Sequence, residues 1–296
     1  MEQGSVRQKL VADFEALPGQ LRQAARYVLD HPRDVALLSM REQAREAGVQ
    51  PATMTRLAQR IGLDGYDSIR TVHAAALRGG EPRGFTAKAG VQVERQKKRG
   101  DRALAADMLG RIAAQVAGLG DVAGLDRLEK AARTLSGARR IYCIGMRSSH
   151  AIAWHLHYTL SMIGDRSVLL DGPGGTGMDL AGRIAPGDAL VAVSVAPYTK
   201  ATVELARLAS SRGAALVAVT DSEVSPLARI ARDVVLVPTD TASFLHTMAP
   251  AFAVAEILGA LVAGHAGDGA LAALEHFDAQ AEALGIHIQP ARKRKA

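Results

Sequence analysis

The stretch Asp188 to Ala206, DALVAVSVAPYTKATVELA, limits the possible folds of this chain more than any other. Leu190 to Val195 is a short apolar run rich in valine, which is typical of a parallel strand buried on both faces. The run ends in a turn that contains Pro197, and a helical pattern begins at Thr199. A strand, a tight turn and a helix N-terminus together leave backbone N–H groups pointing at one spot, which favours an anion-binding site there.

The same alternation continues on both sides of this stretch. Five short apolar runs predict strands over 140–145, 167–171, 190–195, 214–220 and 233–238. Helical patterns lie between and after them, over 149–163, from Thr199 onward, over 226–231 and over 244–263. Strands that alternate with helices predict an α/β doubly wound fold, with a parallel five-stranded sheet covered by helices on both faces.

Polar side chains follow several of these strands, at the edge where such sheets bind ligands. The candidates for ligand binding are Ser148, Ser149, Ser194, Tyr198, Thr199, Ser222 and His246. Serine and threonine are also ordinary helix caps, and a single histidine near an apolar helix is more often structural. Hydroxyl groups at four successive strand ends nevertheless favour a pocket for a phosphate or a polyhydroxy ligand.

The first 78 residues show a different pattern, that of an all-α domain. Ser39 and Glu42 form a capping-box sequence before a helix over 40–47, and Pro51 opens a second helix that ends at Ile61. Gly48 lies in the turn between them, so the pair predicts a helix-turn-helix. The inward residues of this motif are expected to be Ala44, Val49, Met54, Leu57 and Ile61.

The outward face of the second helix carries the side chains that contact base edges and phosphates in a major groove. The predicted DNA-binding residues are Gln50, Thr53, Thr55, Arg56, Gln59 and Arg60. Further helices are expected over 6–17, 20–29, 68–77, 104–119 and 125–135, and residues 78–100 are expected to be a mobile connector without regular structure. The alternative to a DNA-binding helix-turn-helix over residues 40–61 is an ordinary helical hairpin whose polar face is solvated.

Charge and composition limit the kinds of partner and the kinds of site that this chain can have. Residues 1–100 carry 17 lysines and arginines against 11 acidic residues, and four more basic residues lie at 292–295, which favours a polyanionic partner such as double-stranded DNA. The single cysteine, Cys143, excludes a disulfide framework and a cysteine-based zinc site. We expect a cytoplasmic protein with no cofactor, no metal and no membrane segment.

These features together resemble the RpiR-type (MurR/RpiR) bacterial transcriptional regulators. Residues 1–78 are similar to their helix-turn-helix head, and residues from about 125 to 265 are similar to their sugar isomerase (SIS) domain. The second resemblance is carried by GMRSS at 145–149, SVAPYTKATVELA at 194–206 and TDSEVSPLA at 220–228. It implies a homodimer or homotetramer that regulates a catabolic operon in response to a sugar phosphate, with effector contacts at Ser148, Ser149, Ser194, Thr199 and Ser222.

The turn after the third strand departs from the family pattern, which reads Ser-x-Ser-Gly-x-Thr. Ala196 replaces the second serine and removes a hydroxyl group, whereas Pro197 replaces the glycine and removes a backbone N–H. Two groups expected to hold a phosphate are therefore absent. Tyr198 offers a hydroxyl group or a ring face instead.

The sequence predicts four segments: a DNA-binding domain (1–78), a linker with a connecting helix (79–120), an effector-binding SIS domain (121–268), and a C-terminal helix with a basic tail (269–296). We expect a regulator rather than an enzyme, because no pair of carboxylates suited to acid–base catalysis stands out. Glu204 lies too far along the helix after the turn to act as the base, and Glu256 lies in the middle of an apolar helix. The alternatives are a sugar-phosphate isomerase-like enzyme with a helical appendage, and a small-molecule-binding assembly module without a DNA role.

Overall fold

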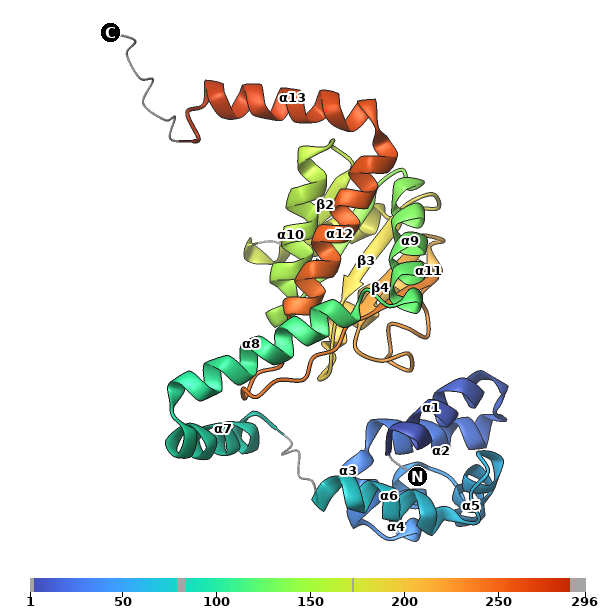
Figure 1. Cartoon of the computed structure of the whole chain (residues 1–296). Helices are drawn as coiled ribbons and strands as arrows, with labels where there is room; N and C mark the ends of the chain where they lie inside the picture. The colour runs from blue at the N-terminus through green and yellow to red at the C-terminus, as the bar shows by residue number, and fades with distance from the viewer. Residues whose placement is uncertain (1–2, 79–83, 172, 288–296) are drawn as a thin grey trace. The chain divides into compact units, whose positions relative to one another are not determined.

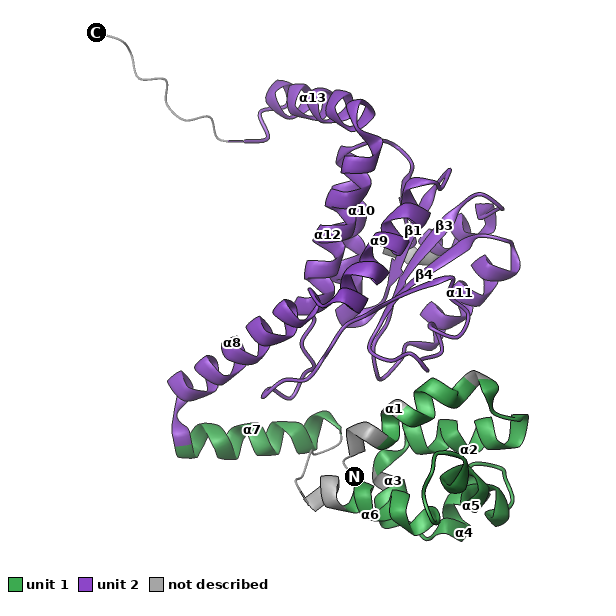
Figure 2. Ribbon diagram, turned by 45° about the vertical axis from the view of Figure 1, so that its right-hand side comes forward, with its two compact units in different colours: residues 1–98 green, residues 99–296 purple. Residues whose placement is uncertain are grey.

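The computed structural model describes residues 3–78, 84–171 and 173–287, and the chain forms two compact units, residues 1–98 and 99–296 (Figure 2). The boundary between the units falls inside the segment assigned to the linker. The basic residues at 292–295 lie outside the described residues.

The first unit is helical (Figure 1). Its elements are α1 (Gln3–Asp13), the 3-10 turn η1 (Phe14–Ala16), α2 (Gly19–Asp30), α3 (Pro32–Leu37), α4 (Met40–Glu46), α5 (Pro51–Arg60), α6 (Tyr66–Arg78) and α7 (Phe85–Arg99). The five residues expected to point inward from the helix-turn-helix are all buried, which confirms that interpretation of the pattern. The capping box is also present, because Ser39 Oγ accepts from the Glu42 N–H while the Glu42 carboxylate accepts from the Ser39 N–H.

Two segments of this unit differ from the prediction. The helix expected over 20–29 ends at Asp30, but an additional short helix that was not predicted, α3, begins at Pro32, since proline is well tolerated in a first helical turn. The expectation of a connector without regular structure over 78–100 is wrong for residues 85–99, which form α7. Gly84 takes a left-handed φ of 80° just before this helix, and Lys97 pairs with Glu94 three residues earlier at 3.5 Å.

The second unit is built on the predicted five-stranded parallel sheet. Its strands are β1 (Ile141–Gly145), β2 (Ser167–Leu169), β3 (Ala189–Val193), β4 (Ala215–Thr220) and β5 (Asp233–Leu236). They lie in the order β2-β1-β3-β4-β5, and Tyr142, Leu190 and Leu216 are aligned across the three central strands. The doubly wound α/β fold expected from the sequence is confirmed.

Helices cover both faces of this sheet (Figure 1). They are α9 (Val122–Ser136), α10 (His150–Met162), the 3-10 segment η3 (Pro173–Arg183), α11 (Lys200–Ser211) and α12 (Ala249–Ala266), with the 3-10 turn η2 (Arg147–Ser149) before α10. Helices α8 (Asp101–Gly118) and α13 (Asp268–Ala283) contact α12. Side chains alternate along each strand, so Cys143 and Val191 pack with α9, α10 and α12, whereas Ile144 and Ala192 pack with η3 and α11.

Two predicted helices of this unit need correction. Residues 226–230 form turns: the Arg229 N–H donates to the Ser225 carbonyl, but the Ile230 and Ala231 N–H groups both donate to the Leu227 carbonyl, so helical bonding does not continue. The helix expected from residue 244 begins at Ala249, where Thr247 Oγ1 accepts from the Ala249 N–H and Pro250 occupies the first turn. Residues 244–248 instead belong to the loop that leaves β5.

Helix α12 is apolar along most of its length. Among the described residues, α12 is the one helix that is long and apolar enough to span a membrane, judged by length and composition alone. Its Val254, Leu258 and Val262 side chains are fully buried against the sheet layer, and the helix packs on α9 and α10. These contacts make α12 a core helix of the second unit.

Candidate functional site

Helix α5 is the second helix of the helix-turn-helix. Gln50 precedes it with extended backbone angles, and Pro51 occupies its first turn. Met54 and Leu57 are fully buried, whereas Gln50, Arg56, Gln59 and Arg60 are exposed. Positions 56, 59 and 60 share one face of a helix, so two guanidinium groups and one amide point away from the core together.

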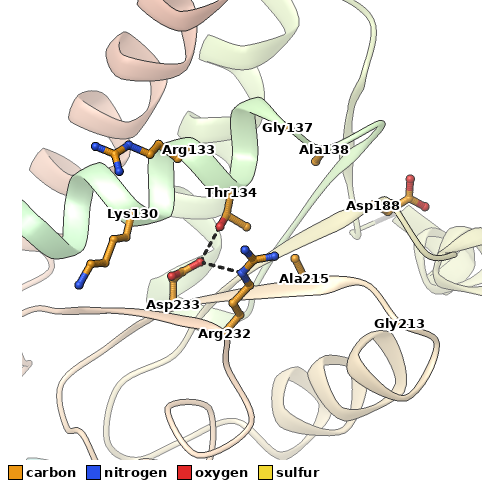
Figure 3. Close-up of a pocket in the computed structure, with 11 residues that line it drawn as sticks. Lys130, Arg133, Thr134, Gly137, Ala138, Asp188, Gly213, Ala215, Arg232 and Asp233 are labelled. Carbon is orange, nitrogen blue, oxygen red and sulfur yellow. Dashed lines mark hydrogen bonds and ion pairs between the residues drawn. The ribbon is translucent and has the colours of Figure 1, made fainter.

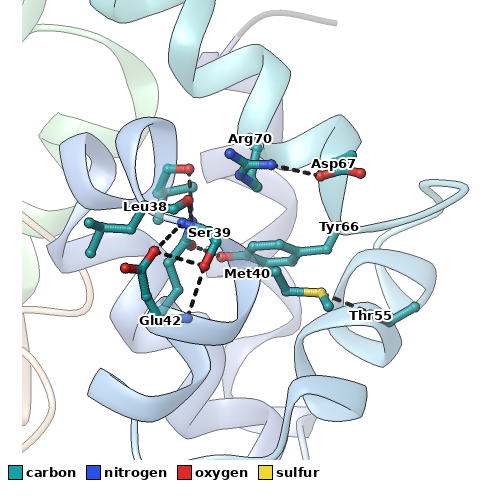
Figure 4. A network of polar contacts seen from close by, with 10 residues as sticks. Leu38, Ser39, Met40, Glu42, Thr55, Tyr66, Asp67 and Arg70 are labelled. Atoms are coloured by element: carbon teal, nitrogen blue, oxygen red, sulfur yellow. Dashed lines mark hydrogen bonds and ion pairs between the residues drawn. The ribbon is translucent and has the colours of Figure 1, made fainter.

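The two threonines of the predicted contact face lie differently. Thr53 is only 8% exposed, so its expected outward position is wrong; it stands four residues before Leu57 and therefore on the core side of the helix. Thr55 is half-buried, and its hydroxyl contacts Met40 Sδ at 3.6 Å (Figure 4). The exposed part of the predicted set is therefore Gln50, Arg56, Gln59 and Arg60.

A buried polar network fixes the helices around α5. Gln43 is fully buried on α4, and its Nε2 donates to the carbonyl groups of Val35 and Leu38 at 3.0 and 2.8 Å. Its Oε1 accepts from the Tyr66 hydroxyl, which ties α6 to α4 (Figure 4). Burial is the main reason that the pKa of Tyr66 lies above its usual range, so this hydroxyl stays a donor. A satisfied buried network of this kind holds helices in one arrangement.

The predicted effector residues lie around the carboxyl edge of the sheet, starting with the turn after β1. Gly145 ends this strand, and a Cβ atom there would lie 2.3 Å from the Ser149 carbonyl oxygen, so glycine is required. Arg147 takes a left-handed φ of 56°, a conformation that costs energy for a residue with a side chain. This tight turn presents Ser148 at the edge and buries Ser149.

The structure brings Ser148 and His246 together. Ser148 Oγ and His246 Nε2 are 2.8 Å apart, so the turn after β1 contacts the loop after β5. Both residues belong to the predicted set. The Thr247 N–H donates to the Thr239 carbonyl at 3.1 Å and closes the base of that loop.

The turn after β3 is held by one hydrogen bond of its own and by one to Asp221, which follows β4. Buried Ser194 accepts from the Thr199 N–H through its Oγ at 3.3 Å, and the Ala196 N–H donates to Asp221 Oδ2 at 3.3 Å. The Tyr198 ring is half-buried and packs against the core cluster under α11, so it serves as a wall of the turn. Ser222 is buried after β4, where its Oγ accepts from the Val224 N–H.

Sequence reasoning missed one polar pair at this edge. His150 Nε2 and Asp171 Oδ2 are in hydrogen-bond contact, and both side chains are partly exposed. His150 opens α10 directly after the serine pair, and Asp171 follows β2. The signal that could have found the pair is the position of Asp171 at a strand end beside a histidine at a helix start.

A cavity of about 450 Å³ lies at the opposite, amino edge of the sheet, between α9 and the starts of β3, β4 and β5 (Figure 3). Its carboxylates already have partners: Thr134 Oγ1 donates to Asp233 at 2.7 Å, and Arg139 donates two hydrogen bonds to Asp188. Asp188 points away from Asp233, and Lys130 points away from both (Figure 3). The polar side chains here either pair with one another, as Thr134, Arg232 and Asp233 do, or point elsewhere, so we place the candidate site at the carboxyl edge.

Comparisons with known proteins agree with this fold. The SIS domain family model matches residues 134–261. The chain is 27% identical over 230 residues to the bifunctional protein glk of Burkholderia orbicola, covering 76% of this chain and 34% of that protein, so the chain spans about a third of that relative's length. It is also 27% identical over 225 residues to an HTH-type transcriptional regulator of Caldanaerobacter subterraneus, covering 74% of this chain and 75% of that one.

Solved structures give the same result. The sugar isomerase domain of an RpiR transcription factor from Sphaerobacter thermophilus superposes with a TM-score of 0.54 at 28% identity, covering 60% of this chain and 98% of that domain. The NanR protein of Vibrio vulnificus, complexed with ManNAc-6P, superposes with a TM-score of 0.50 at 22% identity, covering 94% of this chain and 98% of NanR, and shows the fold. The C-terminal unit of this chain therefore contains a SIS domain over residues 134–261, similar to the sugar isomerase domain of an RpiR transcription factor.

Proposed function

We propose that this chain is a cytoplasmic DNA-binding regulator of a catabolic operon, controlled by a sugar phosphate or a related polyhydroxy effector at the carboxyl edge of its SIS domain. The observation that carries the proposal is the exposed face of Arg56, Gln59 and Arg60 on a helix-turn-helix that precedes a SIS domain. The similarity to a helix-turn-helix regulator and to an RpiR transcription factor supports it.

Homo-oligomer formation fits the exposed apolar surface of α10 and α12. Trp154 and Tyr158 stack on each other with ring centroids 5.4 Å apart, and each is more than 40% exposed. Ile257 on α12 is also exposed. A second copy that covers this surface would place two heads on one two-fold symmetric operator.

The proposed mechanism is a population shift. Effector bound near Ser148 and His246 changes the position of the loop 237–248, and the Gln115 side chain on α8 donates to the Asp240 carbonyl in that loop at 2.8 Å. Helix α8 begins two residues after α7 ends, so a shift of the loop reaches the segment that leads to the head.

A mobility-shift titration with the DNA upstream of the gene tests the proposal. Arg56→Ala with Arg60→Ala should lower affinity and reduce the dependence on salt, by about one unit of slope for each phosphate that the protein no longer neutralises. Arg207→Ala, an exposed arginine of α11, is the matched control and should leave affinity unchanged. Equal DNA affinity for the double variant and the parent protein would refute the DNA-binding assignment.

A sugar isomerase is the second candidate, and the His150–Asp171 pair favours it because the two groups could share acid–base work. Glu204 and Glu256 do not support it, since they pair with Lys200 and His155 and their side chains are 56% and 67% exposed. Turnover of a sugar or its phosphate by the purified chain, lost in Asp171→Asn, would establish the enzyme.

A further inference from the structure

Two backbone donors of the turn after β3 are already occupied. The Ala196 N–H donates to Asp221, the Thr199 N–H donates to Ser194, and Pro197 has no N–H. A phosphate held by such a turn would need these donors for its own oxygen atoms. The turn has the strand-turn-helix outline of an anion-binding site, but its Ala196 and Thr199 N–H groups already donate to side chains of the protein.

Asp221 places a carboxylate beside the Ala196 N–H, in the turn that resembles an anion-binding site. Its carboxylate contacts both the Ala196 N–H and the Thr220 hydroxyl, and its side chain is only partly buried. An ionised carboxylate only accepts hydrogen bonds, and a phosphate ester at neutral pH also mainly accepts and carries negative charge. The remaining lone pairs of Asp221 therefore suit a donor, such as a ligand hydroxyl group.

A second carboxylate flanks the same edge. Asp171 follows β2 and Asp221 follows β4, so the turns after β1 and β3 lie between them. Three strand spacings, roughly 14 Å, separate the ends of β2 and β4 along the edge. Arg147 is an exposed cation, but it lies in the turn after β1. It does not belong to the turn after β3, where Asp221 and Ser194 accept from the backbone N–H groups.

We propose that the effector of this SIS domain is an uncharged polyhydroxy compound, a sugar or polyol without a phosphate group, whose hydroxyl groups donate to Asp221. This inference rests on the proposed function, because it specifies the ligand class of the same site. Asp221 acts as a selectivity residue: it closes the turn and repels anions.

The first test uses inorganic phosphate as the probe against chloride at equal ionic strength, with the full chain and the backbone amide of Ala196 as the NMR readout. The parent protein should show no saturable shift at this amide. Asp221→Ala frees the N–H and removes the charge, so phosphate should bind there more tightly by about tenfold or more. Asp221→Asn removes the charge but keeps an acceptor oxygen, and it should gain less.

Asp165→Asn is the control, because it changes the same charge at an exposed position before β2, at the opposite edge. Saturable phosphate binding at Ala196 in the parent protein, or no gain in Asp221→Ala, would overturn the proposal. In Asp221→Asn without phosphate, an Ala196 amide shift close to that of the parent protein would show that the turn remains folded.

The second test compares each free sugar with its phosphate ester by thermal shift, using glucose, N-acetylmannosamine and their 6-phosphates. We expect stabilisation by free sugars rather than by the esters. An ester that binds and alters DNA affinity would overturn this inference and leave the proposed function standing. Absence of DNA binding altogether would sink the proposed function, while the phosphate titration would still decide the ligand class.

Discussion

Ser148 Oγ and His246 Nε2 lie 2.8 Å apart although 98 positions separate the two residues. In the sheet, β3 and β4 lie between β1 and β5, so the chain that leaves β5 must return across the carboxyl edge to reach Ser148. The contact therefore joins the two ends of the candidate site through a loop that crosses it.

Replacing His246 with alanine should weaken effector binding about tenfold and leave DNA affinity without effector unchanged, because the variant lacks one hydrogen bond that positions the loop and Ser148. Isothermal titration with the effector, alongside mobility shifts, measures both quantities. His265→Ala is the control, since His265 makes an equivalent 2.8 Å contact to Ser136 on other elements. Equal effects in the two variants would remove any special role for His246.

Gly145→Ala should destabilise the second unit by about 3 kcal/mol, because the new Cβ would lie 2.3 Å from the Ser149 carbonyl oxygen and 2.7 Å from its carbon. Backbone atoms cannot move aside as a flexible side chain can. Thermal unfolding measures the change. Gly182→Ala meets no atom within 4 Å and should be nearly neutral, so similar melting temperatures for both variants would contradict the steric argument.

Ser39→Ala should lower the stability of the first unit by about 1 kcal/mol, because the capping box at the start of α4 loses its hydroxyl acceptor. Urea unfolding followed by circular dichroism gives the free energy of unfolding. Thr71→Ala removes an exposed hydroxyl group from α6 and serves as the control. A smaller decrease for Ser39→Ala than for this control would mean that the cap contributes nothing.

Acidification should destabilise the first unit through His73. Burial lowers the pKa of His73, although its contact with the Ile69 carbonyl opposes the shift. The folded chain therefore keeps the ring neutral, while the unfolded chain takes up a proton below a pKa of about 6.5. Stability is complete above that pH and is lost as the pH falls through it, since the unfolded state then binds more protons.

The midpoint of urea unfolding at pH 7.5 and at pH 5.5 checks this expectation, with His73→Gln as the variant. The variant should show a smaller decrease than the parent protein over this interval. His31→Gln is the control, because the His31 side chain is 49% exposed. An unchanged pH dependence in His73→Gln would contradict the assignment.

The sequence predicted well those elements whose apolar residues follow a clear pattern, either a continuous run or helical spacing. The strands are continuous apolar runs, and the buried face of the helix-turn-helix follows helical spacing, so Ala44, Met54 and Leu57 could be placed in the core. Thr53 was misplaced because its side chain is polar, although its position four residues before Leu57 puts it on the core side of α5.

Contacts between distant elements could not be predicted in the same way. The period of a strand does not show which carboxylate will close a turn, so the bond from Ala196 to Asp221 and the His150–Asp171 pair emerged only from the fold. The start of α12 was misplaced because local bonds of the Thr247 hydroxyl replace helical bonds over a stretch that is apolar enough to continue the helix.

Gln115→Ala should uncouple effector binding from DNA binding. Gln115 Nε2 donates to the Asp240 carbonyl in the loop 237–248, and its buried Oε1 has no partner among the residues that the structure describes, so the side chain is committed to this one contact. Since Gln115 lies outside both proposed binding surfaces, each affinity measured alone should be retained. The ratio of DNA affinities with and without effector should move toward one by about tenfold, within the usual range of coupling energies. Arg111→Ala, one turn earlier on α8 and bonded to Asp107, is the control. If Gln115→Ala keeps the full ratio, the signal does not pass through this contact.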